Sequence, residues 1–175
     1  MPRGRATSSS KDIYPQLLLI PSTEQSGADA YSRNLSPVPT PRFGGSATRP
    51  YVFEIVRIFW KFCPTVTAIA GNEYWIQLST VPLTDIVEQE PRVFFFQHLI
   101  IDTTAGAVFT AGDLTGVWDY TDSQGHGLLV GTDFIYLGFD TEATAVATSS
   151  AEVRIEYRIK TVSATEYIGI VQSQQ

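Results

Sequence analysis

The sequence predicts an all-β protein built as an antiparallel sandwich or barrel. From residue 50 onward, short segments rich in aromatic and β-branched residues follow one another, separated by clusters of Gly, Pro, Asp, Asn and Ser. Almost none of these segments shows the period of a helix. The 175 residues are 43% hydrophobic, which suffices for one buried core, and the chain is too short for two ordinary domains. We therefore expect a single β domain.

Residues 1–49 differ from the rest and are expected to form a basic N-terminal arm rich in Pro, Gly and Ser, with the β domain at residues 50–175. The arm holds six basic and three acidic residues, a net charge of +3, whereas the body holds six basic and 15 acidic residues, a net charge of −9. This asymmetry favours a contact between the arm and a polyanion, although a solvated tail accounts for it equally well. The basic residues of the arm are Arg3, Arg5, Lys11, Arg33, Arg42 and Arg49.

Most of the arm shows neither a strand period nor a helix period. Residues 21–49 are rich in Pro, Gly, Ser and Thr, so we expect an extended or disordered segment there. Residues 13–21, IYPQLLLIP, are the exception. Because Pro15 and Pro21 have no N–H to donate, this stretch is predicted to be an edge strand or a segment lying over a neighbour.

The body is expected to begin with a long interior strand at residues 51–62, YVFEIVRIFWKF, which carries apolar residues on both faces. A short helix is expected at residues 83–90, LTDIVEQE, with Thr84 or Asp85 as its N-cap. The other strands before the C-terminal region are expected at 72–80, 92–102, 115–121, 126–131 and 132–140, with a short extended insertion at 107–110.

Two strands are expected to end the chain. At residues 151–162 the apolar Val153, Ile155 and Tyr157 alternate with charged residues, so one face should be core and the other wet or at an interface. The last segment, TEYIGIVQ at 165–172, is rich in β-branched and aromatic residues. Because free termini fray unless a sheet or a docked helix holds them, we expect this strand to be tied into the fold.

Residue types needed for catalysis or for metal binding are scarce. His98 and His126 are the only histidines, they fall on different predicted elements, and Cys63 is the only cysteine. His98 lies in a strongly apolar stretch and His126 in a glycine-flanked turn, so neither is favoured as the general base of a catalytic triad. Two histidines and one cysteine are too few for a zinc site or a transition-metal site, and no phosphate-binding GxxxxGK[ST] loop is present. We therefore predict that the protein is not an enzyme, has no catalytic residues and needs no cofactor or metal.

The hydropathy of the sequence indicates whether the protein is expected to associate with a membrane. The sequence has no uninterrupted run of about 18 apolar residues, and its opening, MPRGRATSSSKD, lacks the apolar middle of a signal peptide. We expect a soluble protein without a membrane partner.

Three stretches resemble the small capsid proteins of circular Rep-encoding single-stranded DNA (CRESS DNA) viruses. They are the basic opening MPRGR, the strand YVFEIVRIFWKF and above all the ending YRIKTVSATEYIGIVQSQQ, which is similar to an EY[IV]GIVQSQQ pattern of that family. The specific match covers only the C-terminal stretch, and elsewhere the resemblance is one of layout. In one respect the sequence departs from the family, because its opening lacks the dense arginine run of many such proteins.

The resemblance implies a single eight-stranded jelly roll with an extended N-terminal arm, in which residues 51–62 are the first strand and residues 165–172 the last. It implies a viral capsid protein, located in the virion and assembled inside the host cell. About sixty copies, the smallest icosahedral closure (T=1), would form a shell around single-stranded DNA held by the arm. The subunit interface would include Tyr167, Ile168, Ile170, Gln172 and Gln174. The host, the receptor and the exact copy number stay open, as do whether the shell packages DNA or RNA or forms empty and whether Ca²⁺ lies at subunit contacts.

Two other functions remain as alternatives. An attachment or carbohydrate-binding module with a β-sandwich fold would use exposed aromatic residues such as Trp75, Trp118 and Tyr120 as a sugar platform. A jelly-roll enzyme of the cupin type would need metal ligands that this composition does not supply.

Overall fold

The computed structural model describes residues 15–25, 31–39, 49–63, 72–101, 114–141 and 149–174. Among these residues, no helix is long and apolar enough to cross a membrane. The elements in chain order are β1 (Gln16–Gln25), β2 (Ser32–Pro37), β3 (Tyr51–Cys63), β4 (Asn72–Ser79), β5 (Val93–Ile101), β6 (Leu114–Asp119), β7 (Leu128–Val130), β8 (Phe134–Thr141), β9 (Ser149–Thr161) and α1 (Ala164–Ser173).

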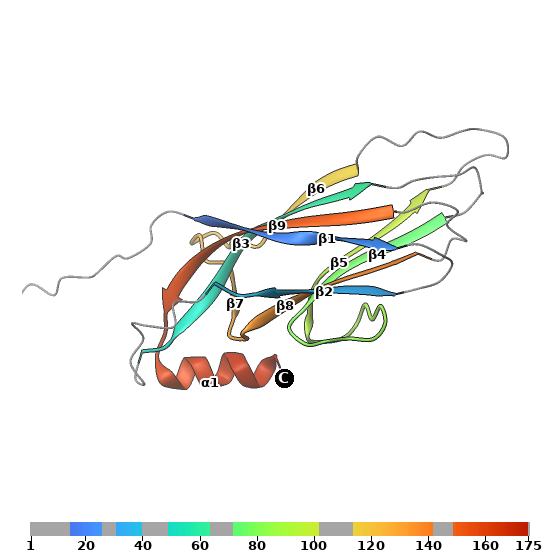
Figure 1. The fold of residues 1–175 in the computed structure, drawn as a ribbon. Helices are drawn as coiled ribbons and strands as arrows, with labels where there is room; N and C mark the ends of the chain where they lie inside the picture. Colours follow the sequence, from blue (N-terminus) through green and yellow to red (C-terminus); the bar gives the residue numbers. More distant parts are fainter. Residues whose placement is uncertain are drawn as a thin grey trace, which may run out of the picture.

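The strands form two antiparallel sheets packed face to face (Figure 1). Sheet A has the order β1-β9-β3-β6, with β7 also paired to β3, and sheet B has the order β2-β8-β4-β5. Because β6 and β7 pair with different parts of β3, they act as one interrupted strand. The first strand then pairs with the eighth, the second with the seventh, the third with the sixth and the fourth with the fifth. This is the topology of a jelly roll, and the predicted fold class is confirmed.

The order of strands within the roll differs from the expected one. Residues 51–62 lie in β3, the third strand of the roll, and not in the first. The first two strands are β1 and β2, which lie within residues 1–49 and pair with β9 and β8. β1 forms one edge of sheet A, as predicted for the segment at residues 13–21. Part of the stretch at 21–49, expected to be extended or disordered, is therefore strand. Residues 107–110 lie outside the described residues.

The core lies between the two sheets and consists of the inward-facing residues of each strand. From sheet A, Ile55 and Ile58 are fully buried, and the ring of Phe53 stacks on Tyr157 at 4.3 Å between centroids. Phe62 of the same sheet meets Tyr74 of sheet B at 4.6 Å. Burial of each such side chain contributes about 1.5–3 kcal/mol, so this interlayer packing is the main source of stability.

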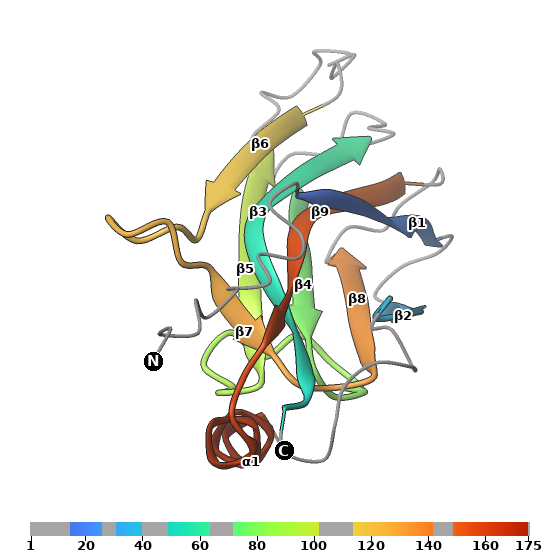
Figure 2. The same cartoon turned by 90° about the vertical axis from the view of Figure 1, so that its left-hand side faces the viewer.

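The C-terminal segment is a helix, so the prediction of a last strand at residues 165–172, wedged into the core, is wrong. The hydroxyl of Ser163 caps the helix by accepting a hydrogen bond from the Glu166 N–H at 3.2 Å. No residue of α1 is fully buried. Figure 2 shows α1 across one end of the sandwich, below β7 and β9. The segment is nevertheless tied into the fold, as expected, by docking and not by sheet pairing.

Residues 83–90 were expected to form a helix, and the structure shows irregular backbone there. The physical reason lies in the side chain of Gln77, which donates to the Asp85 carbonyl at 2.9 Å and accepts from the Val87 N–H at 3.1 Å. Backbone groups that a helix would pair internally are thus bonded to sheet B. The prediction of a helix is wrong at this site.

Candidate subunit interface

The outer face of sheet A combines apolar and charged side chains. β3 presents Arg57, Phe59 and Lys61 to this face at alternate positions, whereas the buried Ile58 and Phe62 point to the core side. Cross-strand pairing extends the face on both sides of β3, to β9 and then β1 in one direction and to β6 in the other. The face therefore spans four strands.

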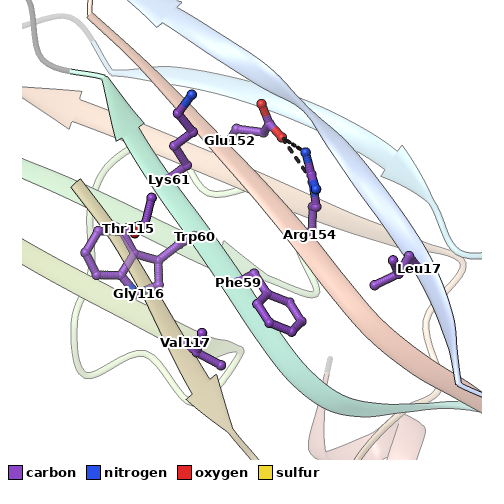
Figure 3. A pocket seen from close by; sticks show the side chains of 9 residues that line it. All are labelled: Leu17, Phe59, Trp60, Lys61, Thr115, Gly116, Val117, Glu152 and Arg154. Carbon is purple, nitrogen blue, oxygen red and sulfur yellow. Dashed lines mark hydrogen bonds and ion pairs between the residues drawn. The ribbon is translucent and has the colours of Figure 1, made fainter. Parts of the chain in front are cut away.

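A hollow of about 590 Å³ lies on this face (Figure 3). Its apolar lining comes from Leu17 of β1, Phe59 and Trp60 of β3 and Val117 of β6. Leu17 is 66% exposed and Val117 58% exposed. Isolated apolar residues are common on protein surfaces, but a group that spans several strands marks an interaction site. The remaining lining residues are Lys61, Thr115, Gly116, Glu152 and Arg154.

One glycine lets the hollow's aromatic wall lie close to β6. A Cβ atom at Gly116 would come within 2.5 Å of the Trp60 indole ring, far closer than packing allows. The absence of a side chain therefore fixes where the Trp60 ring can lie. Sequence reasoning missed the hollow, although one signal was present: the apolar Phe59 falls on the same face of its strand as Arg57 and Lys61.

An ion-pair network flanks the hollow on the outer face. The Arg57 guanidinium lies 3.0 Å from a carboxylate oxygen of Asp119 and 3.4 Å from one of Glu156. The N–H and hydroxyl of Thr121 also donate to Asp119, at 2.8 and 2.6 Å. The hydrogen bonds from Thr121, together with Arg57, lower the pKa of Asp119 to about 2. This carboxylate is therefore ionised throughout the neutral range.

A second network on the same sheet holds the connection between β6 and β7. The carboxylate of Glu54, of which only 6% is exposed, pairs with Arg158 and Lys160, each at 3.4 Å, and accepts from the Gly127 N–H at 3.1 Å. Arg158 also donates to the Gly125 carbonyl at 2.6 Å, and Gly125 has a φ of 78°, which favours glycine. Figure 2 shows this connection projecting from the side of the sandwich.

The outer face of sheet B is partly covered by the chain's own β4–β5 connection. Gln77 lies on this face with no exposed surface. Besides its bonds to the Asp85 carbonyl and the Val87 N–H, its amide donates to the Tyr31 hydroxyl at 3.2 Å. All these groups lie in connections outside the strands, so Gln77 fastens two connections to the sheet.

The β4–β5 connection carries an exposed apolar side chain among acidic ones. Val87 is 40% exposed, and Asp85 and Glu88 beside it are exposed as well. Glu90 pairs with Arg92, whose hydrogen bond lowers the pKa of Glu90. The connection is thus acidic and carries an exposed apolar side chain, and we call residues 83–90 the Val87 loop.

The helix α1 docks through one of its sides. A Cβ atom at Gly131 would lie 3.0 Å from a methyl of Val171 and 3.2 Å from one of Ile170. The Tyr167 hydroxyl is 3.5 Å from the Gly131 carbonyl. These residues recur at helical spacing, so one side of α1 rests on the backbone that follows β7.

Gln174 fastens the end of the helix to the same backbone. Its side chain accepts from the Gly131 N–H at 2.9 Å and donates to the Leu129 carbonyl at 2.7 Å, and its own carbonyl accepts from the Thr80 hydroxyl at 3.0 Å. Among the predicted interface residues, Tyr167, Ile170 and Gln174 therefore contact their own subunit. Ile168, 55% exposed, and Gln172 face away from it. Their role between subunits stays a prediction.

The structure describes two of the six basic residues expected to contact nucleic acid. Arg33 lies on β2, where its guanidinium donates to the Leu83 carbonyl at 2.9 Å and lies 5.7 Å from the centroid of the Tyr136 ring. Arg49 is exposed just before β3. The structure does not bring Arg33 and Arg49 into contact. The other four, Arg3, Arg5, Lys11 and Arg42, lie outside the described residues.

The aromatic residues considered as a sugar platform lie at two separate places. Trp75 of sheet B stacks on His98 at 5.1 Å. Trp118 of sheet A meets Phe95 edge-on at 6.5 Å, closing one side of the sandwich. The Tyr120 hydroxyl donates to a backbone carbonyl of β5, and burial raises its pKa to about 12. The three residues form no common platform.

The two histidines lie apart and each contacts one carboxylate. His98 Nε2 is 2.8 Å from Glu73 Oε2, and His126 Nδ1 is 3.1 Å from Asp122 Oδ2. Within the described ranges, no three potential metal ligands cluster.

Comparisons with known proteins found likeness in structure alone. No protein-family model and no curated protein matches the sequence. The VP1 pentamer of KI polyomavirus, in its unassembled form, superposes with a TM-score of 0.53 at 11% identity, over 86% of this chain and 94% of that one. The VP1 pentamer of human polyomavirus 6 gives 0.52 at 11%, over 86% and 95%. VP1 of human polyomavirus 12, in complex with 3'-sialyllactosamine, gives 0.51 at 9%, over 86% and 100%.

At 9–11% sequence identity, the similarity to these VP1 structures shows only that the folds are alike. The two facing sheets, with α1 added after the last strand, form a jelly roll similar to the fold of these VP1 structures.

Proposed function

We propose that this chain is the shell-forming subunit of a virus capsid and that its copies associate through the outer face of sheet A. The main observation that supports this proposal is the hollow on that face, where Leu17 and Val117 are exposed on strands at opposite edges of sheet A. A monomeric protein seldom leaves such a group of apolar side chains open. The fold supports the same proposal, because similar solved structures are VP1 pentamers.

The finer proposal is a small icosahedral shell of about sixty copies, the smallest closed number. A subunit of such a shell needs several different contact surfaces that close by symmetry. Besides the hollow, the exposed Ile168 and Gln172 of α1 offer a second surface. The shell would encapsidate single-stranded DNA, a proposal supported by the resemblance of the C-terminal sequence to CRESS DNA virus capsid proteins.

The basic arm would bind the nucleic acid. Residues 1–49 carry a net charge of +3 on a body of −9, so phosphates should be attracted to the arm and repelled by most of the body. Arg3, Arg5 and Lys11 are the basic residues nearest the start of the chain. The guanidinium of Arg33 is partly engaged with the Leu83 carbonyl, and it contributes less to this proposal.

The test uses the purified recombinant protein. Negative-stain microscopy would give particle size, and the 260/280 absorbance ratio before and after nuclease would give protected nucleic acid. We expect uniform closed shells with nuclease-resistant nucleic acid. Deletion of residues 1–11 should leave shell formation intact and lower the nucleic acid content.

Two results would overturn parts of the proposal. A stable monomer across a range of salt and pH would remove the capsid function. Unchanged nucleic acid content after the deletion would remove the role of the arm. A variant with Arg3, Arg5 and Lys11 replaced by Gln keeps the length of the arm and separates the effect of charge from the effect of length.

A further inference from the structure

The hollow of sheet A has a basic rim on an acidic protein. Its charged lining residues are Lys61, Arg154 and Glu152, a net charge of +1. Arg154 and Glu152 pair at 3.2 Å, and 59% of the Arg154 side chain stays exposed (Figure 3). The body as a whole carries −9, so an acidic, apolar-tipped segment would fit this hollow better than it fits most of the surface.

The Val87 loop has the complementary properties. Residues 83–90 contain Asp85, Glu88 and Glu90 and no basic residue. Glu90 pairs with Arg92, so Asp85 and Glu88 are the acidic residues that give this loop its negative charge. The exposed Val87 lies between Asp85 and Glu88 in the sequence. Gln77 donates to the Asp85 carbonyl and accepts from the Val87 N–H, and these bonds hold this part of the loop in place, so little ordering entropy would be lost on binding.

We propose that the hollow of one copy receives the Val87 loop of a second copy, with Val87 against Leu17, Phe59 and Val117 and with the acidic residues beside Arg154 and Lys61. This proposal rests on the proposed function and names the contact. Apolar burial would supply the affinity, and the opposite charges would set orientation and exclude other registers.

The placement of the two surfaces decides the kind of assembly. The hollow lies on the outer face of sheet A, whereas the Val87 loop is bonded to Gln77 on the outer face of sheet B. Each copy therefore offers one loop and one hollow at different places. A contact between unlike surfaces is heterologous and generates rings when its rotation closes, as a shell requires.

The experiment measures assembly of the full chain by sedimentation velocity across a concentration series. Val87→Asp places a charge where the proposal needs an apolar contact, and it should raise the concentration needed for assembly at least tenfold. Leu35→Asp is the matched control, because Leu35 is 51% exposed on β2 and belongs to neither surface. It should assemble as the wild type does.

A charge exchange tests the partner directly. Glu88→Arg and Arg154→Glu should each weaken assembly, and the double variant should recover most of the loss, because the opposite charges meet again across the contact. Circular dichroism and thermal unfolding would verify that each variant is folded. If Val87→Asp does not fold, the charge-exchange variants still test whether the loop of one copy contacts the hollow of another.

The outcomes separate this contact from the proposed function. Wild-type shells together with normal assembly of Val87→Asp, or a double variant no better than either single variant, would overturn the contact and leave the capsid function standing. A wild-type protein that stays monomeric under all conditions would overturn both.

Discussion

The outer faces of the two sheets differ in what covers them. On sheet B, the chain's own β4–β5 connection lies against the face, and Gln77 is completely buried beneath it. On sheet A, the hollow stays open between Leu17 and Val117. Both sheets pack against the same core, so the packing of the core does not explain why one outer face is covered and the other is open.

This difference suggests that the residues important for folding stability and those important for subunit association lie on different faces of the sandwich. The polar groups of sheet B are satisfied within the subunit, by hydrogen bonds that Gln77 makes to two connections. On sheet A, charged side chains pair with one another and leave the apolar side chains of the hollow open. Substitutions under the covered face should therefore act mainly on folding, and substitutions in the open hollow mainly on assembly.

The largest expected effect is a loss of folding stability caused by a substitution on sheet A, outside the hollow. Glu54→Gln removes a nearly buried carboxylate and leaves Arg158 and Lys160 without their counter-charge. Hydrogen bonds to charged groups contribute about 1.5–3 kcal/mol, and Arg158 and Lys160 keep about a third of their side chains exposed, so the free energy of unfolding in urea should fall by about 2–3 kcal/mol. Glu152→Gln is the control on the same face, because its pair with Arg154 is more exposed and should change stability by less than about 1 kcal/mol. Equal effects would show that burial does not set the importance of these pairs.

A smaller effect is expected under the covered face. Gln77→Leu keeps the side chain's volume and removes its hydrogen bonds to Tyr31, Asp85 and Val87. Loss of buried hydrogen bonds costs about 1–3 kcal/mol, less than the loss of Glu54 because water can reach part of the loop. Hydrogen exchange of the Val87 amide should accelerate in Gln77→Leu and stay unchanged in Gln97→Leu, a substitution at a partly exposed position of β5. A Val87 amide that exchanges equally fast in both would contradict the role of Gln77.

The sequence predicted the interior strands well because each carries its own pattern. The alternation of Val153, Ile155 and Tyr157 placed β9 within two residues of its observed bounds, Ser149–Thr161. β2 was missed because its residues, SRNLSP, are mostly polar. It is a strand through its pairing with β8 and not through its own composition. A mostly polar edge strand of this kind leaves little trace in a sequence, whereas the apolar residues of β1 made that edge strand recognisable.

The helix α1 was missed for a different reason, because the signal was present and another outweighed it. Tyr167, Ile168 and Ile170 favour a strand by composition. However, Ser163 followed three residues later by Glu166 has the pattern of a helix start, and Tyr167, Ile170 and Val171 recur at helical spacing. The hollow itself could not be predicted, because its lining comes from four strands whose adjacency depends on the order of the roll.

The smallest expected effect concerns Asp119 at the margin of the open face. Its folded-state pKa of about 2 lies below the ordinary value of 3.8, so its ionised form stabilises the folded protein at neutral pH. That contribution is fully present above about pH 4 and is lost as the pH falls toward the folded pKa. The melting temperature of Asp119→Asn should therefore lie slightly below that of the wild type at pH 7, and the difference should vanish near pH 2. NMR titration of the carboxyl carbon offers a direct check, because Thr121→Val removes one donor and should raise the pKa of Asp119. An ordinary pKa in the wild type would mean that the Thr121 and Arg57 contacts do not persist in solution, and the margin of the hollow would be less ordered than the ion pairs of sheet A indicate.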